Sequence, residues 1–385
     1  MERKNAVIVA FGRSAIAKAI RGSLRYTGCA DFGTQVLRGI LERNPGFDPA
    51  LAEDLICGCA IPEAEQGLNI GRLLADSSGF PLSTAGQTVN RFCASGLQSI
   101  ASAANAIMAG QARCIVAGGL ENMSKVQMHR VAIIPDSASF GSYPDNFDTM
   151  GITAENVAER WGISRQELDE FSARSQQKCA RAMETGRFKD EIVPVTVKQK
   201  KQTVVVDTDE GPRPTTTVEI LSKLKPAFKP DGVVTAGNSS GINDGAAAVV
   251  LLSEEKAREL GVKPMARFVA GALAGVDPAV MGVGPVAASQ KAMAKAGLTV
   301  ADFDLIEANE AFAAQSVAVA RELHFDPEKL NVNGGAIALG HPVGASGCRI
   351  LVTLLHEMQK RDAKKGLATL CIGGGMGCAA IVERD

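Results

Sequence analysis

The chain has few aromatic residues, no excess of charge of either sign and no long apolar run. Phe, Tyr and Trp make up 4% of its 385 residues. Its 41 basic and 42 acidic residues give a formal net charge of −1, so no field of one sign is available to hold nucleic acid or an acidic membrane. No stretch of about 20 apolar residues occurs, and we therefore expect no membrane span.

The ends of the chain also lack targeting patterns. Residues 1–8 contain neither a long apolar run nor a cleavage site, and residues 383–385 match no organelle address. The nine cysteines are scattered, and the close pair Cys57 and Cys59 has no second pair at zinc-site spacing. We expect a cytoplasmic protein without a metal site, in which most thiols are small buried hydrophobic groups.

Glycine is abundant, with 40 residues, and strand patterns alternate with helix patterns. Strand-like runs at 6–10 and 114–117 are examples, and Ile100, Ala104 and Ile107 recur at helical spacing. A chain of this length predicts two or three domains. The alternation predicts an α/β fold with buried, partly parallel sheets.

Two tripeptides recur at nearly the same offset, which indicates two similar halves. Asp-Leu-Ile begins at positions 54 and 304, which differ by 250, and Ala-Ser-Gly begins at 94 and 345, which differ by 251. Each Ala-Ser-Gly opens a helical stretch that leads to an apolar strand. We expect these strands to end in the glycines at 118–119 and 373–375.

The region between the halves has a different composition. It carries a charged helix pattern at 163–187, a Lys-rich strand pattern at 193–206 and a Pro-rich turn at 211–214. We predict an inserted cap whose loops cover a site between the halves and exclude water. The expected division is 1–120 plus about 243–266 for the first half, 121–242 for the cap and 267–385 for the second half.

Cys93 is the first candidate for chemistry. It stands where a strand pattern ends and a helix pattern begins, followed by Ala94, Ser95 and Gly96. The free N–H groups and the positive dipole end of a helix stabilise a thiolate, which is the nucleophilic form. The small residues that follow leave room for a substrate. A buried thiol at a helix start is the alternative.

His341 is one of four histidines and the only one in a Gly-rich loop that leads into a helix pattern. Glycines leave space for a ligand and allow positive φ. A structural role is the alternative for a single histidine. Aligning the two Ala-Ser-Gly triplets places His341 opposite Asn90, close to Cys93. The two helix starts are therefore expected to meet at one site.

Two further candidates follow apolar strands. Cys371 leads into the glycines at 373–375, whose bare backbone N–H groups suit an oxyanion hole. A tight turn with a buried cysteine is the alternative. Asn309 follows a strand pattern at 305–306, a common site position in α/β folds. It is suited to hold a water or a carbonyl oxygen, and a helix N-cap is the alternative.

Taken together, these motifs resemble those of the thiolase family, in the family's order and over nearly the whole chain. The likeness rests on the nucleophile motif at 90–96 and on three further motifs, Asn-Glu-Ala-Phe at 309–312, Gly-His-Pro at 340–342 and Cys-Ile-Gly-Gly-Gly at 371–375. It extends to residues 150–155 and 237–246.

The resemblance implies a five-layered α-β-α-β-α core of two similar halves plus an inserted loop domain. It implies coenzyme A thioesters as substrates, no metal or redox cofactor, and a homodimer or homotetramer. His341 would activate Cys93 to attack the keto carbon of a 3-ketoacyl-CoA. Acetyl-CoA would leave, coenzyme A would collect the acyl group, and Cys371 would exchange a proton with the acetyl carbon.

The resemblance also implies roles for further residues. The N–H groups of Cys93 and Gly373 would form one oxyanion hole, and His341 with a water held by Asn309 would form the other. The substrate-binding residues implied in the same way are Met150, Phe228, Ala236, Ser240, Met281 and Phe312.

Within the family, the members specific for acetoacetyl-CoA resemble this chain less around 124–149. Their segment is longer and has His directly before Met-Gly, where this chain has Thr149. This difference favours a broader, degradative substrate range of the fatty-acid β-oxidation type over a biosynthetic acetoacetyl-CoA thiolase. A ketoacyl synthase would not normally carry the second thiol of Cys371. A non-catalytic acyl-CoA binder would have lost one of Cys93, His341 and Cys371.

Overall fold

The computed structural model describes residues 4–127, 137–142, 144–199 and 202–385. The first half of the core consists of β1 (Ala6–Arg13), α1 (Cys29–Glu42), β3 (Asp54–Gly58), α2 (Ile70–Ser78), β4 (Ala85–Val89), α3 (Ser95–Met108), β5 (Cys114–Asn122) and β8 (Asn243–Ser253). The second half consists of β9 (Ala266–Gly275), α9 (Gly284–Ala296), β10 (Leu305–Ala308), α10 (Ala313–Glu322), α12 (Val343–Arg361), β11 (Lys365–Ile372) and β12 (Met376–Glu383).

The strands form two sheets joined by a short ladder. Their order is β4-β3-β5-β8-β1 in the first half and β9-β12-β11-β10 in the second. β1 and β9 pair only at Val7–Arg267 and Ile8–Ala266, and this ladder connects the sheets. The short β2 (Ala17–Lys18) pairs with β8. Each half therefore has its own sheet, with the chain crossing from one to the other through β8, α8 (Glu254–Leu260) and β9.

The predicted duplication is confirmed at the level of strand pairing. In the first half β3 runs parallel to β5, which is antiparallel to β8, which is antiparallel to β1. In the second half β10, β11, β12 and β9 follow the same pattern. The repeated Asp-Leu-Ile lies at β3 and β10. One detail was wrong: β5 does not end at Gly118 and Gly119 but continues to Asn122.

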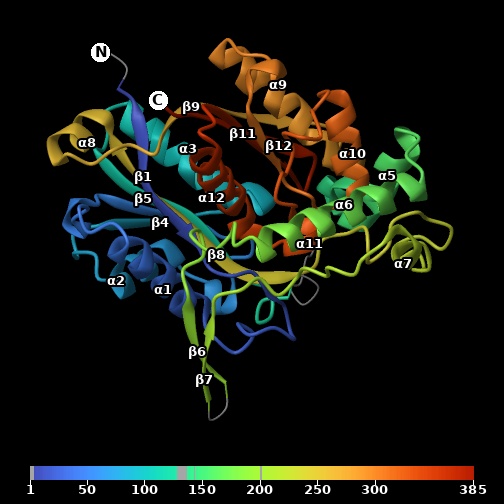
Figure 1. Cartoon of the computed structure of the whole chain (residues 1–385), viewed down its shortest axis with the longest axis horizontal. Helices are drawn as coiled ribbons and strands as arrows, with labels where there is room; N and C mark the ends of the chain where they lie inside the picture. Colours follow the sequence, from blue (N-terminus) through green and yellow to red (C-terminus); the bar gives the residue numbers. More distant parts are fainter. Residues whose placement is uncertain (1–3, 128–136, 143, 200–201) are drawn as a thin grey trace.

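Three buried apolar clusters separate five layers, as the resemblance implied (Figure 1). α1 and α2 cover the outer face of the first sheet, α3 and α12 lie between the sheets, and α9 and α10 cover the outer face of the second. Alternation along β5 shows the principle, because Val116 faces the outer cluster while Ile115 faces the central one. The helical set Ile100, Ala104 and Ile107 lies in the central cluster.

Glycines allow the two central helices to touch at their starts. A Cβ built on Gly96 of α3 would lie 2.8 Å from the backbone nitrogen of Cys348, and one on Gly347 of α12 would lie 2.5 Å from that of Leu97. Both glycines close an Ala-Ser-Gly triplet. The repeated triplet therefore marks a helix crossing too tight for any larger side chain.

The chain between β5 and β8 contains the predicted cap elements. The charged helix is α6 (Arg165–Glu184), which begins with a capping box between Ser164 and Glu167. The Lys-rich run forms a projecting hairpin of β6 (Val195–Gln199) and β7 (Gln202–Val206), seen at the bottom of Figure 1. Other elements are α4 (Ser137–Ser142), η5 (Pro144–Phe147), α5 (Met150–Arg160) and α7 (Val218–Ser222). The division of the chain into domains stays a prediction.

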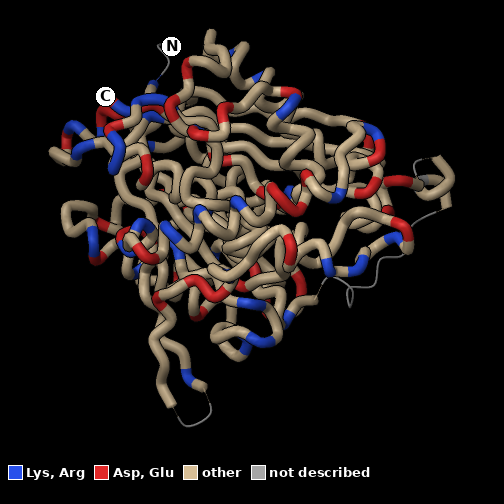
Figure 2. Tube along the Cα trace, turned by 45° about the vertical axis from the view of Figure 1, so that its right-hand side comes forward, with Lys and Arg blue, Asp and Glu red and all other residues tan. Residues whose placement is uncertain are grey.

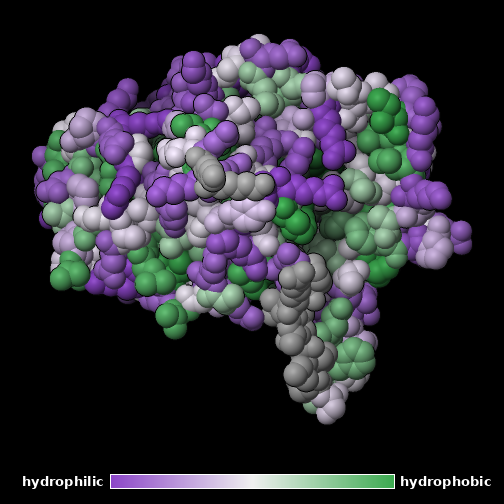
Figure 3. Space-filling model, turned by 90° about the horizontal axis from the view of Figure 1, so that it is seen from below, coloured by the Kyte–Doolittle hydropathy of each residue, from purple (hydrophilic) through white to green (hydrophobic). Residues whose placement is uncertain are grey.

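The surface matches the balanced composition. Figure 2 shows Lys and Arg interspersed with Asp and Glu along the trace rather than gathered by sign. On the face in Figure 3, hydrophobic residues lie in small groups among hydrophilic ones. Within the described part of the chain, no helix combines the length and apolar character needed to cross a membrane.

Candidate active site

Cys93 is presented by a tight turn between β4 and α3. It lies in the short helix η3 (Phe92–Ala94), directly before the first turn of α3. Phe92 has φ of +43°, a left-handed conformation that is unusual for a bulky residue. Ser95 Oγ holds this turn by accepting from the Arg91 N–H at 2.9 Å and donating to the Phe92 carbonyl at 2.7 Å. The thiol is consequently fixed at a helix start, 9% exposed.

Cys371 and Gly373 reach the same place from the second half. Cys371 is the second-last residue of strand β11 and is fully buried. After the strand the chain turns through Gly374 and Gly375, which have φ of +79° and +76°. This turn brings the Gly373 N–H to the sulfur of Cys93, whose pKa it lowers. Burial raises the pKa of the Cys371 thiol, and Cys93 lies close enough for its charge to raise that pKa further. The structure therefore brings Cys93, Cys371 and Gly373 together.

His341 is held on one side and free on the other. Its Nδ1 lies 2.5 Å from Ser346 Oγ, and its backbone N–H donates to Asn243 Oδ1 at 3.0 Å. Ser346 Oγ donates its own proton to the Pro342 carbonyl at 2.8 Å, so it accepts from Nδ1–H. The buried Nε2 is then the acceptor, and none of the described residues donates to it.

The start of α12, which follows His341, lies against the turn that carries Cys93. Val343 and Cys348 of α12 share one buried cluster with Cys93, and α12 contacts η3 directly. The two helix starts therefore meet, as their alignment predicted.

Asn309 follows β10 and faces His341. Its side-chain Nδ2 lies 3.5 Å from His341 Nδ1, and its buried Oδ1 finds no donor among the described residues. α10 begins at Ala313, four residues later, so Asn309 is not its N-cap. The alternative interpretation of Asn309 as a helix cap is thus excluded, and its amide belongs to the group around His341.

Burial decides the charge states of the two central groups. It raises the pKa of the Cys93 thiol to about 11, although the Gly373 N–H partly opposes this. It lowers the pKa of His341 to about 4, with a further contribution from the positive charge of Arg349. Desolvation therefore opposes the thiolate that the helix start is expected to favour. The resting pair is a neutral thiol and a neutral imidazole.

An apolar cluster surrounds the second thiol. Met150, Met281 and Phe312 pack around Cys371 together with Ala311. The ring of Phe228 lies edge-on to that of Phe312, with centroids 5.9 Å apart. These four predicted substrate-binding residues thus form one group on the cap side of Cys371.

The other two predicted binding residues lie on the loop that follows. The Ser240 N–H donates to the Ala311 carbonyl at 2.9 Å, which places Ser240 beside this group. Ala236 is exposed on the same loop, and no contact of the structure ties it to the other predicted residues.

Two residues that hold His341 were missed from the sequence. Ser346 orients Nδ1, and Asn243 anchors the backbone. Ser346 was visible as the middle member of the second Ala-Ser-Gly triplet, and its counterpart Ser95 organises the Cys93 turn in a similar way. Asn243 gave no local signal, because its partner lies 98 residues away.

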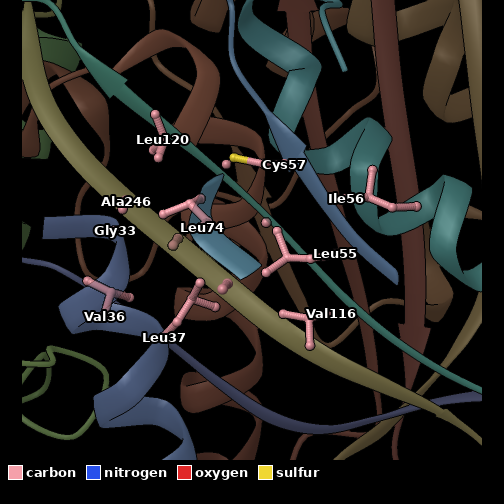
Figure 4. A pocket seen from close by; sticks show the side chains of 15 residues that line it. Gly33, Val36, Leu37, Leu55, Ile56, Cys57, Leu74, Val116, Leu120 and Ala246 are labelled. Atoms are coloured by element: carbon pink, nitrogen blue, oxygen red, sulfur yellow. The ribbon is translucent and has the colours of Figure 1, made fainter. Parts of the chain in front are cut away.

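A pocket elsewhere in the core is not part of this site. Figure 4 shows it among α1, α2, β3, β5 and β8, with Leu37, Leu55 and Leu74 on its walls. None of the predicted site residues lines it. Its lining is apolar and rich in Gly and Ala, as expected for a packing gap in the outer layer. Among the described residues, no three His, Cys, Asp or Glu side chains gather as metal ligands would.

Comparison with known proteins places these features in a family. The family model described as "Thiolase, N-terminal domain" matches residues 6–255, and "Thiolase, C-terminal domain" matches residues 262–384. The chain is 51% identical to an acetyl-CoA acetyltransferase of Allochromatium vinosum, over 99% of both chains. It is 48% identical to a 3-ketoacyl-CoA thiolase of Bacillus subtilis, also over 99% of both.

A solved structure agrees with this likeness. The crystal structure of the Bacillus anthracis acetyl-CoA acetyltransferase superposes with a TM-score of 0.91 and 42% sequence identity. The match covers 99% of each chain.

Proposed function

The chain belongs to the thiolase family of acyltransferases, and we propose that it cleaves 3-ketoacyl-CoA with coenzyme A through an acyl group on Cys93. The observation that carries this proposal is the meeting of Cys93 with the Gly373 N–H and the second thiol of Cys371. A nucleophile, an oxyanion donor and a separate proton carrier are what a carbon–carbon cleavage beside a thioester requires.

The first half-reaction makes the acyl-enzyme. His341 Nε2 takes the proton of Cys93 as the sulfur attacks the keto carbon, which avoids a resting charge in a buried site. The N–H groups of Cys93 and Gly373, or His341 with a water on Asn309, stabilise the oxyanion that forms. The bond between C2 and C3 breaks, and the acetyl-CoA carbanion takes its proton from Cys371.

The second half-reaction returns every group to its starting state. The Cys371 thiolate takes the proton of the incoming coenzyme A thiol, whose sulfur attacks the acyl carbon. The Cys93 sulfur leaves and recovers its proton from the His341 imidazolium. The cycle consumes no electrons, so it needs no redox cofactor, and the side chains named here supply every proton transfer.

We propose a broad, degradative acyl range of the β-oxidation type. The apolar cluster of Met150, Met281 and Phe312 supports this, because methionine side chains adapt to ligands of different shape. The alternative is a biosynthetic acetoacetyl-CoA thiolase, which is favoured by the name acetyl-CoA acetyltransferase carried by relatives such as that of Escherichia coli, 50% identical. Thiolysis rates with 3-ketoacyl-CoA esters of 4 to about 16 carbons distinguish the two.

The test of the acyl-Cys93 intermediate is direct. Incubation with acetyl-CoA should add one acetyl group per chain, detected by intact-mass spectrometry and placed on Cys93 by peptide mapping. Cys114→Ala is the control, because Cys114 is a buried cysteine in the outer apolar cluster, at the start of β5. An acetyl group found on a residue other than 93, and persisting in Cys93→Ser, would refute the assignment.

We further propose that two copies of the chain pair through β4. This strand ends the sheet, and on its outer side no strand of the described chain pairs with it. Leu68 and Leu82 near it are 92% and 85% exposed, and Phe92 is 48% exposed. An unpaired edge beside large apolar side chains is typical of an interface. Leu68→Glu with Leu82→Glu should shift the mass from light scattering to that of a monomer.

The cellular location stays a proposal as well. We propose a cytoplasmic enzyme whose partners are coenzyme A and acyl-CoA rather than nucleic acid, consistent with the mixed surface charge in Figure 2.

A further inference from the structure

Glu121 is a fully buried carboxylate at the junction of the two halves. It lies in β5, with 0% of its surface exposed. Aligning the strand pairs places it opposite Cys371, because β5 pairs with β3 as β11 pairs with β10 and the repeated Asp-Leu-Ile sets the offset of 250, from 54 to 304. The first half thus has an acid where the second half has its reactive thiol.

Every partner of this carboxylate is a donor. Oε2 accepts from the Gly344 N–H and the Ala60 N–H, both at 2.8 Å. Oε1 accepts from Gln66 Nε2 at 2.6 Å and lies 3.7 Å from the thiol of Cys59. A side chain with two oxygens and no donor is the only kind that fits such a shell.

The contact with Gly344 supplies what α12 lacks. Pro342 precedes the helix and gives no side-chain cap, so the first N–H groups of α12 need an acceptor from elsewhere. Gly344 is the second residue of α12 and stands three residues after His341. Its missing side chain matters, because a Cβ there would lie 2.6 Å from Glu121 Oε2.

We propose that Glu121 is a positioning residue that caps α12 from the opposite half and thereby sets His341 against Cys93. It touches neither substrate nor reacting atoms. It acts through the hydrogen bond from the Gly344 N–H, which holds the start of α12, and with it the loop of His341, against strand β5 of the first half. This inference rests on the proposed function, since it assigns a role within that reaction.

The charge of Glu121 predicts a second measurable effect, a change in the pH dependence of Cys93 alkylation. Burial is the main cause of the raised pKa of Cys93, and the negative charge of Glu121 on β5 adds to it. The other titratable groups of the site are His341, before α12, and Cys371, on β11. Glu121 itself faces Cys59 of the loop after β3. Removing its charge should therefore move the alkylation of Cys93 to lower pH.

Two substitutions separate position from charge. Glu121→Gln places an amide NH₂ among donors and removes the charge, so kcat should fall about 10²-fold with KM little changed. The pH midpoint of Cys93 inactivation by iodoacetamide should also fall. Glu121→Asp keeps the charge but loses the reach to Gly344, so kcat should fall while the midpoint stays.

Glu310→Gln is the matched control. Glu310 is a buried carboxylate that accepts from Ser175 Oγ, Asn331 Nδ2 and the Ile337 N–H, and among the described residues none of its hydrogen bonds reaches the start of α12. Its loss should lower Tm with a smaller change in kcat and no change in the alkylation midpoint. If both Glu121 variants lose only Tm and keep the wild-type kcat, the inference fails. If wild-type enzyme forms no acetyl-Cys93, the proposed function fails instead.

Discussion

Cys93 and Gly344 stand at matching positions beside the starts of the two central helices, α3 and α12, and the groups that surround them differ. The Cys93 start meets the Gly373 N–H and the thiol of Cys371. The Gly344 start meets the Ala60 N–H and the carboxylate of Glu121. His341 has Asn90 as its counterpart by the Ala-Ser-Gly offset of 251, and Asn309 has Cys59 by the Asp-Leu-Ile offset of 250. The Cys93 helix start is therefore surrounded by reactive groups. The Gly344 helix start is closed by a carboxylate that only accepts hydrogen bonds.

This difference shows how a duplicated core makes one site rather than two. The architecture offers two helix starts that meet, each with a strand end beside it. In the first half a carboxylate saturates the donors, which leaves nothing for a substrate to bind. In the second half the donors stay directed at a sulfur. Substitutions that exchange properties between the halves therefore test the comparison.

The largest effect is expected from Cys93→Ala, which makes the α3 start as unreactive as the α12 start. Without the sulfur no acyl-enzyme forms, and thiolysis should fall about 10⁵-fold or more. The measurement is loss of the magnesium–ketoacyl absorbance, together with intact mass after acetyl-CoA. Acylation of the Cys93→Ala enzyme at the wild-type rate would show that Cys93 is not the nucleophile.

His341→Asn gives the second half the residue that stands opposite it in the first. Both half-reactions should fall, by about 10⁴-fold, because the variant loses the base for Cys93 and an oxyanion donor together. Exchange of label between acetyl-CoA and coenzyme A measures acyl transfer separately from thiolysis. If exchange survives while thiolysis is lost, His341 does not activate Cys93.

Cys371→Ala removes the proton carrier and leaves the nucleophile. Thiolysis, and exchange of the acetyl-CoA methyl protons with solvent, should fall about 10³-fold. Acetylation of Cys93 should continue at a reduced rate, since the Gly373 N–H and His341 are unchanged while the coenzyme A thiolate leaves without a proton from Cys371. A Cys371→Ala enzyme that cannot be acylated, beside a Cys93→Ala enzyme that can, would exchange the two roles.

Substitution of the two matching serines, Ser346 and Ser95, should also affect the two helix starts differently. Ser346→Ala frees Nδ1 of His341, and kcat should fall about 10-fold with an altered pH profile because the imidazole loses its orientation. Ser95→Ala loosens the turn at Phe92 and should lower Tm more than it changes the pH profile. Equal pH profiles for both variants would show that Ser346 does not orient the ring.

The smallest effect on catalysis is expected from substitution of His356, which lies on α12. Burial lowers the pKa of His356 to about 3, so the unfolded chain binds its proton first as pH falls below about 6.5. The stability from this group is present above that pH and is lost on acidification. Between pH 7 and pH 4, His356→Leu should therefore lose about 3 kcal/mol less unfolding free energy than wild type, as measured by urea melts at the two pH values. If the unfolding free energy falls equally from pH 7 to pH 4 in His356→Leu and in wild type, the prediction is wrong.

Local pattern was enough to predict much of the fold. Helical spacing placed Ile100, Ala104 and Ile107 in the central layer, and alternation placed the strands. The repeated tripeptides predicted the two halves, because each lies at an element boundary whose geometry demands small or turn-forming residues. The ordered motifs brought Cys93, His341, Cys371 and Asn309 to attention, since each stands where an element begins or ends.

Only the tertiary structure decided what those residues do to one another. Whether Cys93 rests as thiol or thiolate depends on how much water the surrounding layers exclude, and a helix start in the sequence does not reveal that. The holding of His341 by Ser346 and Asn243, and the capping of α12 by Glu121, join residues up to 223 positions apart. Such contacts follow from the packing of one half on the other, because burial obliges every donor at the junction to find an acceptor across it.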